Sequence, residues 1–173
     1  MDVMDAIRTR LEVRDYADKS IPSDVLDCIL DAGRLAPSGK NYQHWRFIVV
    51  RELDALEQLA DISTSGSWVA GADTAIIILT DPTYPYHDID AGRAITHMQF
   101  AAWDARIGSC IYTGYDESAM RSTFDIPEDY AMSAVLALGY PKFDPDDLTG
   151  RKARKSLESV AFEGQFGEPY SGA

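Results

Sequence analysis

Cysteine is scarce in this sequence, with only Cys28 and Cys110 among 173 residues. The two lie far apart in the chain, so neither a disulfide framework nor a CxxC redox motif is available. Each has apolar neighbours in the sequence, which favours small core residues over redox groups. The chain is nevertheless long enough to bury roughly 70% of its unfolded surface without cross-links.

Long apolar runs are also missing. No stretch reaches the ~18 consecutive apolar residues that a membrane helix needs. Residues 1–14 carry both signs of charge and lack the apolar core of a signal peptide, so we expect them to be part of the mature protein. We therefore expect a cytoplasmic protein without a membrane partner.

Basic residues are few beside acidic ones, with 16 Lys and Arg against 28 Asp and Glu and a net charge of -12. Nucleic acid and anionic membranes repel such a surface, so neither is expected as a partner. An anionic ligand must find a local basic pocket. The acidity suits a protein kept soluble at high salt, but an acidic protein from an ordinary habitat has the same composition, and both interpretations stay open.

The spacing of apolar residues predicts a layered arrangement of helices and strands. Helices are predicted at residues 23–33, 53–62, 90–105 and 116–124, and strands at residues 45–50, 75–79, 109–112 and 134–138. The continuous apolar run at 75–79 is typical of a central strand covered on both faces. Without repeats or linkers, the pattern predicts one domain, residues 1–173, of α+β or α/β layers. The tail at 142–173 is expected to wrap a surface.

A polar loop at residues 36–45 is the most informative segment. It reads Ala-Pro-Ser-Gly-Lys-Asn-Tyr-Gln-His-Trp and lies between an amphipathic helix and an apolar strand. Pro37 fixes its own φ, and Gly39 frees the backbone. Ser38, Asn41 and Gln43 supply hydrogen-bond donors and acceptors at close intervals. A flat ligand rich in heteroatoms suits such a loop.

Basic residues gather near the two ends of the chain. The first cluster comprises Arg8, Arg10 and Arg14, and the second comprises Arg151, Lys152, Arg154 and Lys155. Arginine pairs with phosphate oxygens in a bidentate way and lysine adds a point charge, so together the clusters predict a phosphate site. A solvated face of surface charges is the alternative that composition leaves open.

These segments resemble the nitroreductase family of FMN-dependent oxidoreductases over nearly the whole chain. The opening pattern of that family, Ile-x-x-Arg-Arg-Ser-x-Arg-x-Phe, has its counterparts at Ile7, Arg10, Arg14 and Tyr16. Its Ala-Pro-Ser-x-x-Asn-x-Gln-x-Trp block is matched fully at residues 36–45 and is the most specific of the three blocks. Its Gly-Leu-Gly-Thr-Cys-Trp-x-Gly-Gly block resembles residues 106–114, and its closing basic segment resembles residues 152–154.

The resemblance implies an α+β fold of the nitroreductase type, with a mixed central sheet flanked by helices. It also implies an intertwined homodimer that has two FMN sites at the subunit interface. The flavin then carries the redox chemistry, so no side chain is expected to be catalytic. NADH or NADPH would reduce the flavin in a ping-pong cycle, and nitroaromatics or quinones would be the small-molecule acceptors.

Site residues follow from the resemblance position by position. Arg10, Lys152 and Arg154 are expected to bind the phosphate. Arg14 is expected to lie near the pyrimidine side of the isoalloxazine. The backbone N–H at Thr113-Gly114 lies toward flavin N5. The partner chain's loop contributes Pro37, Ser38, Gly39, Asn41 and Gln43.

Two departures from the family pattern stand out. Leu11-Glu12 occupies part of the cofactor site where the family has Arg-Ser, so a carboxylate lies close to the expected phosphate. Glu12 must turn away or form an ion pair, with Arg8 or Arg14 as the expected partner. The chain is also short where larger members carry a segment over the flavin. A flavin-binding module without turnover, or an enzyme for a specialised acceptor such as a halogenated aromatic, therefore stays open.

The histidines and carboxylates around residue 90 form no strong metal motif. His87, Asp88, Asp90 and His97 lack the spacing of known ligand sets, and no metal is predicted. Asp88 or Asp90 is expected to cap the long helix instead.

Overall fold

The computed structural model describes residues 1–145 and 152–172. Its helices are α1 (Val3–Thr9), α2 (Ser23–Arg34), α3 (Leu53–Ile62), α4 (His87–Asp104) and α5 (Glu117–Phe124), with short 3-10 turns η1 (Gly39–Asn41), η2 (Ser67–Gly71) and η4 (Leu157–Ser159). Its strands are β1 (Arg46–Val50), β2 (Thr74–Thr80), β3 (Gly108–Tyr112) and β4 (Ala131–Gly139).

The four strands form one sheet in the order β1-β2-β4-β3. All three strand pairs are antiparallel, with Val50 opposite Ala75 in the first and Thr74 opposite Leu138 in the second. The expected mixture of parallel and antiparallel strands was therefore wrong for this sheet. Every residue of β2 is buried, which confirms the central strand that its continuous apolar run predicts.

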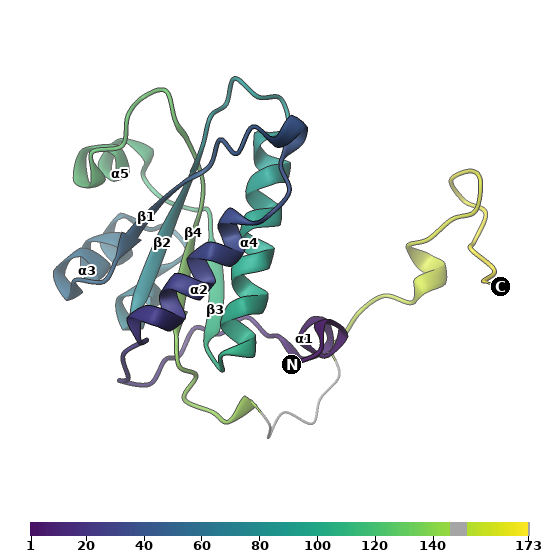
Figure 1. Ribbon diagram of the computed structural model, residues 1–173, viewed down its shortest axis with the longest axis horizontal. Coiled ribbons are helices and arrows are strands. Elements are labelled where there is room, and N and C mark those ends of the chain that lie inside the picture. Colours follow the sequence, from purple (N-terminus) through teal and green to yellow (C-terminus); the bar gives the residue numbers. More distant parts are fainter. Residues whose placement is uncertain (146–151, 173) are drawn as a thin grey trace.

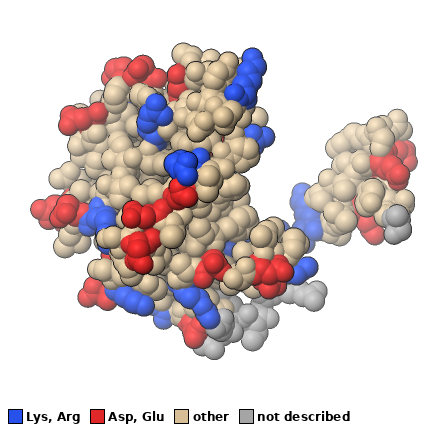
Figure 2. Space-filling model, viewed as in Figure 1, with Lys and Arg blue, Asp and Glu red and all other residues tan. Residues whose placement is uncertain are grey.

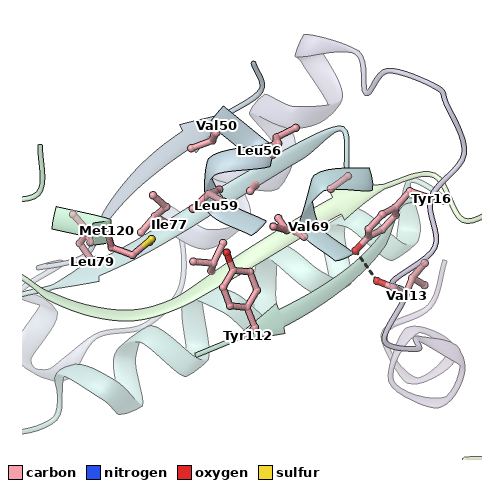
Figure 3. Packing of buried hydrophobic residues seen from close by; sticks show 14 of the residues in the cluster. Val13, Tyr16, Val50, Leu56, Leu59, Val69, Ile77, Leu79, Tyr112 and Met120 are labelled. Carbon is pink, nitrogen blue, oxygen red and sulfur yellow. Dashed lines mark hydrogen bonds between the residues drawn. The ribbon is translucent and has the colours of Figure 1, made fainter. Parts of the chain in front are cut away.

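Helices cover both faces of the sheet (Figure 1). Successive residues of a strand point to opposite faces, so Ile76 packs with Ile29 of α2 and Met98 of α4, whereas Ile77 packs with Leu59 of α3 on the other side. Figure 3 shows the apolar layer on the α3 side of the sheet, where Val69 of η2 and Met120 of α5 pack with Tyr112 of β3 in one cluster. The two apolar layers explain why α2 and α3 carry their apolar residues on one side.

Helix α4 is the longest helix described, and two of the segments with predicted site residues lie beside its two ends. Its 18 residues correspond to about 27 Å. Near its C-terminal end, Asp104 accepts a bond from the amino group of Met1 at 2.5 Å, and Trp103 Nε1 donates to Thr9 Oγ1 at 2.9 Å. These bonds attach α1 to that end of the helix. The polar loop at 36–45 packs against the other end.

The C-terminal tail leaves the body of the chain instead of covering it. Lys152 Nζ donates to the carbonyl oxygen of Ile7 at 2.7 Å, and beyond that point residues 155–172 run outward (Figure 1). The tail turns back on itself through a bridge between Phe162 and Pro169. Phe166 is 92% exposed. The tail therefore does not wrap the surface of its own chain, although the sequence predicts that it wraps a surface.

Several local expectations were also wrong. Cys28 is exposed, because it lies on the solvent side of α2, whereas Cys110 is buried as predicted. Helix α4 begins at His87 with no side-chain cap, so neither Asp88 nor Asp90 caps it. Helix α1 was not predicted, although Asp2 caps it by accepting from the backbone N–H of Met4 at 2.7 Å. Among the described helices, none combines the length and apolar character that crossing a bilayer would take.

Candidate functional site

Cations from the two ends of the chain meet beside α1. Arg10 follows the last turn of α1, and Lys152 is held against that helix by its bond to the Ile7 carbonyl. Burial lowers the pKa of Lys152, and the nearby charges of Arg10 and Arg154 lower it further. The structure therefore brings together the three cations that the resemblance assigns to a phosphate. Arg151 lies outside the described residues.

The charge distribution agrees with this convergence. Figure 2 shows basic side chains where the tail begins and acidic ones farther along it. Arg8, in contrast, points to solvent and lies 3.9 Å from Asp5 on its own helix. Lys155 is exposed. The cluster thus consists of Arg10, Lys152 and Arg154 within an otherwise acidic protein.

Glu12 does not turn away from this cluster. Its carboxylate lies 2.5 Å from Nη1 of Arg10, so Glu12 does form an ion pair as expected, but with Arg10 instead of Arg8 or Arg14. The backbone explains the choice, because Glu12 forms a bridge to Ser109 of β3 and Val13 N–H donates to the Ser109 carbonyl at 2.9 Å. These contacts hold residue 12 beside the end of α1, where Arg10 is the neighbouring cation.

Arg14 lies on the same segment, next to β3. A hydrogen bond with Cys110 raises the pKa of Arg14, and its guanidinium carbon lies 5.8 Å from the centroid of the Trp68 ring. Tyr16 fixes the segment further, because its hydroxyl donates to the Val13 carbonyl at 2.6 Å (Figure 3). Arg14 is thus an exposed, permanently charged group beside the Trp68 ring.

Cys110 itself is an unreactive thiol. Burial raises its pKa to about 11, which keeps the sulfur protonated at neutral pH. The structure gives it no role as a nucleophile, in agreement with the expectation that it is a core residue.

The turn at Thr113-Gly114 directly follows β3. Gly114 accepts hydrogen bonds through its carbonyl oxygen from the backbone N–H of Thr64 at 2.8 Å and from Ser63 Oγ at 3.3 Å. A Cβ at Gly114 would lie 2.5 Å from Thr64 Oγ1, so the chain passes too close there for a larger residue. Thr113 follows Cys110 of β3 by three residues, which corresponds to about 10 Å. The turn is therefore at the end of the same strand that contacts Arg14 through Cys110.

The polar loop has an unusual backbone. Lys40, Asn41 and Gln43 adopt positive φ angles of 51°, 60° and 51°, a region that costs residues other than glycine free energy. Within the loop, Ser38 Oγ accepts from the backbone N–H of Gln43 at 3.0 Å. The side chains of Pro37, Asn41 and Gln43 are exposed, so they are available to a ligand.

One chain does not bring the loop and the basic cluster together. The loop bonds to Asp90 near the start of α4, whereas α1 bonds to Trp103 near its end. Thirteen residues of helix between these two points correspond to about 20 Å. Figure 1 shows η1 and α1 at opposite ends of α4. The predicted site residues therefore form two groups, one beside each end of α4.

A sequence model of the nitroreductase family matches most of the chain, in two overlapping segments at residues 7–81 and 64–140. The chain belongs to the nitroreductase family. This confirms the resemblance seen in the loop and basic motifs and accounts for the α+β arrangement of this nitroreductase-family protein.

Relatives of this nitroreductase-family protein extend over most of its length. A protein of Methanothermobacter thermautotrophicus is 33% identical in an alignment of 165 positions that covers 86% of each chain. A protein of Archaeoglobus fulgidus is 36% identical in an alignment of 150 positions that covers 81% of this chain and 86% of the relative. Both are provisionally named NADH dehydrogenase/NAD(P)H nitroreductase.

A solved structure from Desulfovibrio desulfuricans shares the fold. It is a provisionally assigned nitroreductase in complex with FMN, has a TM-score of 0.83 and 27% identity, and matches 96% of this chain and 98% of its own. One residue that shapes the site, Asp90, was not predicted as a site residue from the sequence, although its carboxylate binds the loop. A signal for it existed, because the four-residue spacing of Asp90, Ala94 and Met98 places all three on one helix face, and the last two are apolar.

Proposed function

We propose that this nitroreductase-family protein is an FMN-dependent oxidoreductase that uses NADH or NADPH to reduce small acceptors such as nitroaromatics or quinones in a ping-pong cycle. The observation that carries the proposal is the convergence of Arg10, Lys152 and Arg154 in a chain of net charge -12. The FMN complex of the Desulfovibrio desulfuricans relative supports it.

The residues of the cluster fit a flavin phosphate. Burial lowers the pKa of Lys152, and the charges of Arg10 and Arg154 lower it further, so an anion between the three cations would relieve their mutual repulsion. Arginine supplies the planar pair of donors that phosphate oxygens accept. Arg10, Lys152 and Arg154 would therefore hold the phosphate, and Arg14 would lie near the pyrimidine side of the ring system.

A second copy of the chain is part of the proposal. About 20 Å of α4 separates the loop from the basic cluster of one chain, so the loop of another copy would complete each site. The outstretched tail supports an intertwined homodimer, because it exposes Leu157, Val160 and Phe166 without burying them on its own body. The loop would contribute Pro37, Ser38, Gly39, Asn41 and Gln43.

The protein's own residues would bind and orient. When bound, FMN supplies the hydride chemistry that no side chain of this site offers. The backbone N–H at Thr113-Gly114 would lie toward flavin N5, next to the strand that contacts Arg14. Cys110 stays a protonated core thiol, so no covalent step through sulfur belongs to this mechanism.

Flavin binding and reduction test the proposal directly. The purified protein is reconstituted with FMN, and binding is followed by flavin fluorescence. Stopped-flow spectra without oxygen then record flavin bleaching with NADH and with NADPH, and a panel of nitroaromatics, quinones and halogenated aromatics records reoxidation. We expect a yellow dimer that at least one donor reduces. A protein that binds no FMN after reconstitution contradicts the proposal.

One observation favours a second candidate function. The carboxylate of Glu12 already forms an ion pair with Arg10, as expected for a site in which phosphate binding has weakened. A flavin-binding module without turnover would show bound FMN that neither NADH nor NADPH reduces, and the same stopped-flow experiment distinguishes the two.

A further inference from the structure

A buried carboxylate supports the polar loop from beneath. The Asp90 side chain is 1% exposed, and both of its oxygens have partners. Oδ2 accepts from the backbone N–H of Gly39 at 2.9 Å and lies 3.1 Å from His44 Nε2, and Oδ1 accepts from Arg93 Nη1 at 3.1 Å. A buried carboxylate is costly unless it is paired and hydrogen-bonded. Its position is therefore tied to loop groups at Gly39 and His44.

Aromatic rings reinforce this attachment. The Tyr84 ring lies between His44, at 5.0 Å between ring centroids, and Tyr42, at 4.6 Å. The Tyr86 ring closes against Gly39, where an added Cβ would lie 2.3 Å from the ring. Residues 84–90 thus contact the loop at Gly39, Tyr42 and His44.

The loop needs support from outside itself. The positive φ angles of Lys40, Asn41 and Gln43 persist only where surrounding contacts enforce them. The hydrogen bond from Gln43 N–H to Ser38 Oγ joins two residues of the loop itself, so it does not fix where the loop lies relative to the rest of the protein. The contacts with Asp90 and Tyr84 supply that placement.

We infer that Asp90 is a positioning residue, which acts together with His44 to hold residues 38–43 in the shape that contacts the flavin ring system. What the loop binds rests on the proposed function, whereas its attachment to Asp90 does not. Within one chain the cluster of Arg10, Lys152 and Arg154 lies at the other end of α4, and the bonds of Asp90 go to Gly39, His44 and Arg93 instead.

Asp90→Asn tests this inference, with Asp88→Asn as the matched control. Both changes remove one negative charge from the first turn of α4, but the Asp88 side chain is 77% exposed. In the flavin-free protein, we expect amide hydrogen exchange of residues 38–43 to become about tenfold faster or more in Asp90→Asn, because the neutral amide keeps only one acceptor oxygen and the bonds to a charged group are weakened. Exchange at residues 10–14 stays as in the wild type. Asp88→Asn leaves both segments unchanged.

Flavin affinity gives a second readout. Since the loop would contact the ring system, Asp90→Asn lowers the affinities for FMN and for riboflavin by the same factor, about tenfold. A substitution in the phosphate cluster lowers the FMN affinity alone. An equal loss of both affinities together with faster loop exchange supports the inference, and wild-type exchange in the loop overturns it.

A second variant keeps the test decisive if Asp90→Asn does not fold. His44→Phe retains an aromatic ring beside Tyr84 but cannot bond to Asp90, and we expect the same accelerated loop exchange to a smaller extent. Wild-type exchange in a folded His44→Phe protein overturns the inference as well. If the wild type binds no flavin, the proposed function fails, and hydrogen exchange still decides whether Asp90 positions the loop.

Discussion

Glu12 and Arg10 form an ion pair of 2.5 Å within the group of cations that we propose as the phosphate site. Backbone contacts between residues 12–13 and Ser109 hold the carboxylate there. An incoming phosphate must therefore displace Glu12 from Arg10 or share the guanidinium with it. The pair makes the cost of FMN binding measurable through single substitutions.

Glu12→Gln should raise the affinity for FMN by about two- to fivefold, because it removes a competing anion from a partly exposed ion pair. Riboflavin lacks the phosphate, so its affinity should not change. Fluorescence titrations with both flavins measure the ratio. Glu57→Gln, on the exposed side of α3, is the control for the loss of one negative charge. An equal gain for riboflavin would contradict the competition.

Arg10→Ala should weaken FMN binding by about 10- to 100-fold, the range expected when a charge-assisted hydrogen bond to an anion is lost. Riboflavin binding should change little. The matched control is Arg8→Ala, which removes the same charge at a position two residues before Arg10. The Arg8 side chain pairs with Asp5 and lies outside the cluster. If both variants bind FMN as tightly as the wild type, the phosphate assignment is wrong.

Leu59→Ala should lower the free energy of unfolding by about 2–5 kcal/mol, because Leu59 is fully buried beneath the sheet and its removal leaves a cavity. Leu53→Ala on the same helix is the control. The Leu53 side chain is 63% exposed, so the same substitution there should change stability by no more than about 0.5 kcal/mol. Urea unfolding of both variants provides the comparison.

The two cysteines should differ sharply toward iodoacetamide. Burial raises the pKa of Cys110 to about 11, so below that pH the sulfur is mainly the unreactive thiol, and only at higher pH does the thiolate form. Cys28 is exposed on α2. At pH 8 we expect mass spectrometry to find Cys28 alkylated and Cys110 unmodified, with both modified in urea. Rapid native labelling of Cys110 would contradict its burial.

Phe166→Glu should weaken the proposed dimer. Phe166 is 92% exposed on the outstretched tail, and a second copy would bury it against apolar surface. Sedimentation equilibrium should show more monomer than in the wild type. Glu168→Gln, on the same tail, serves as a control in which an exposed polar residue changes. A dimer of unchanged strength would remove Phe166 from the interface.

Local pattern alone determined several elements of this fold. The apolar spacing at 53–62 predicts α3 with the observed bounds, and the run at 75–79 predicts the buried strand β2. Both features are written in neighbouring residues, and packing only confirms them. Helix α1 escaped prediction because it has only 7 residues, fewer than the window over which a helical spacing of apolar residues can be recognised.

The sequence by itself also determined which groups are available to a ligand, since the loop at 36–45 and the cations at both ends are visible in the residue types. Only the tertiary structure decided how these groups are arranged. It placed Arg10 beside Lys152 and Glu12, and it buried Asp90 beneath the loop. It also put these two groups at opposite ends of α4. Such relationships depend on which distant segments pack together, and no local spacing encodes that choice.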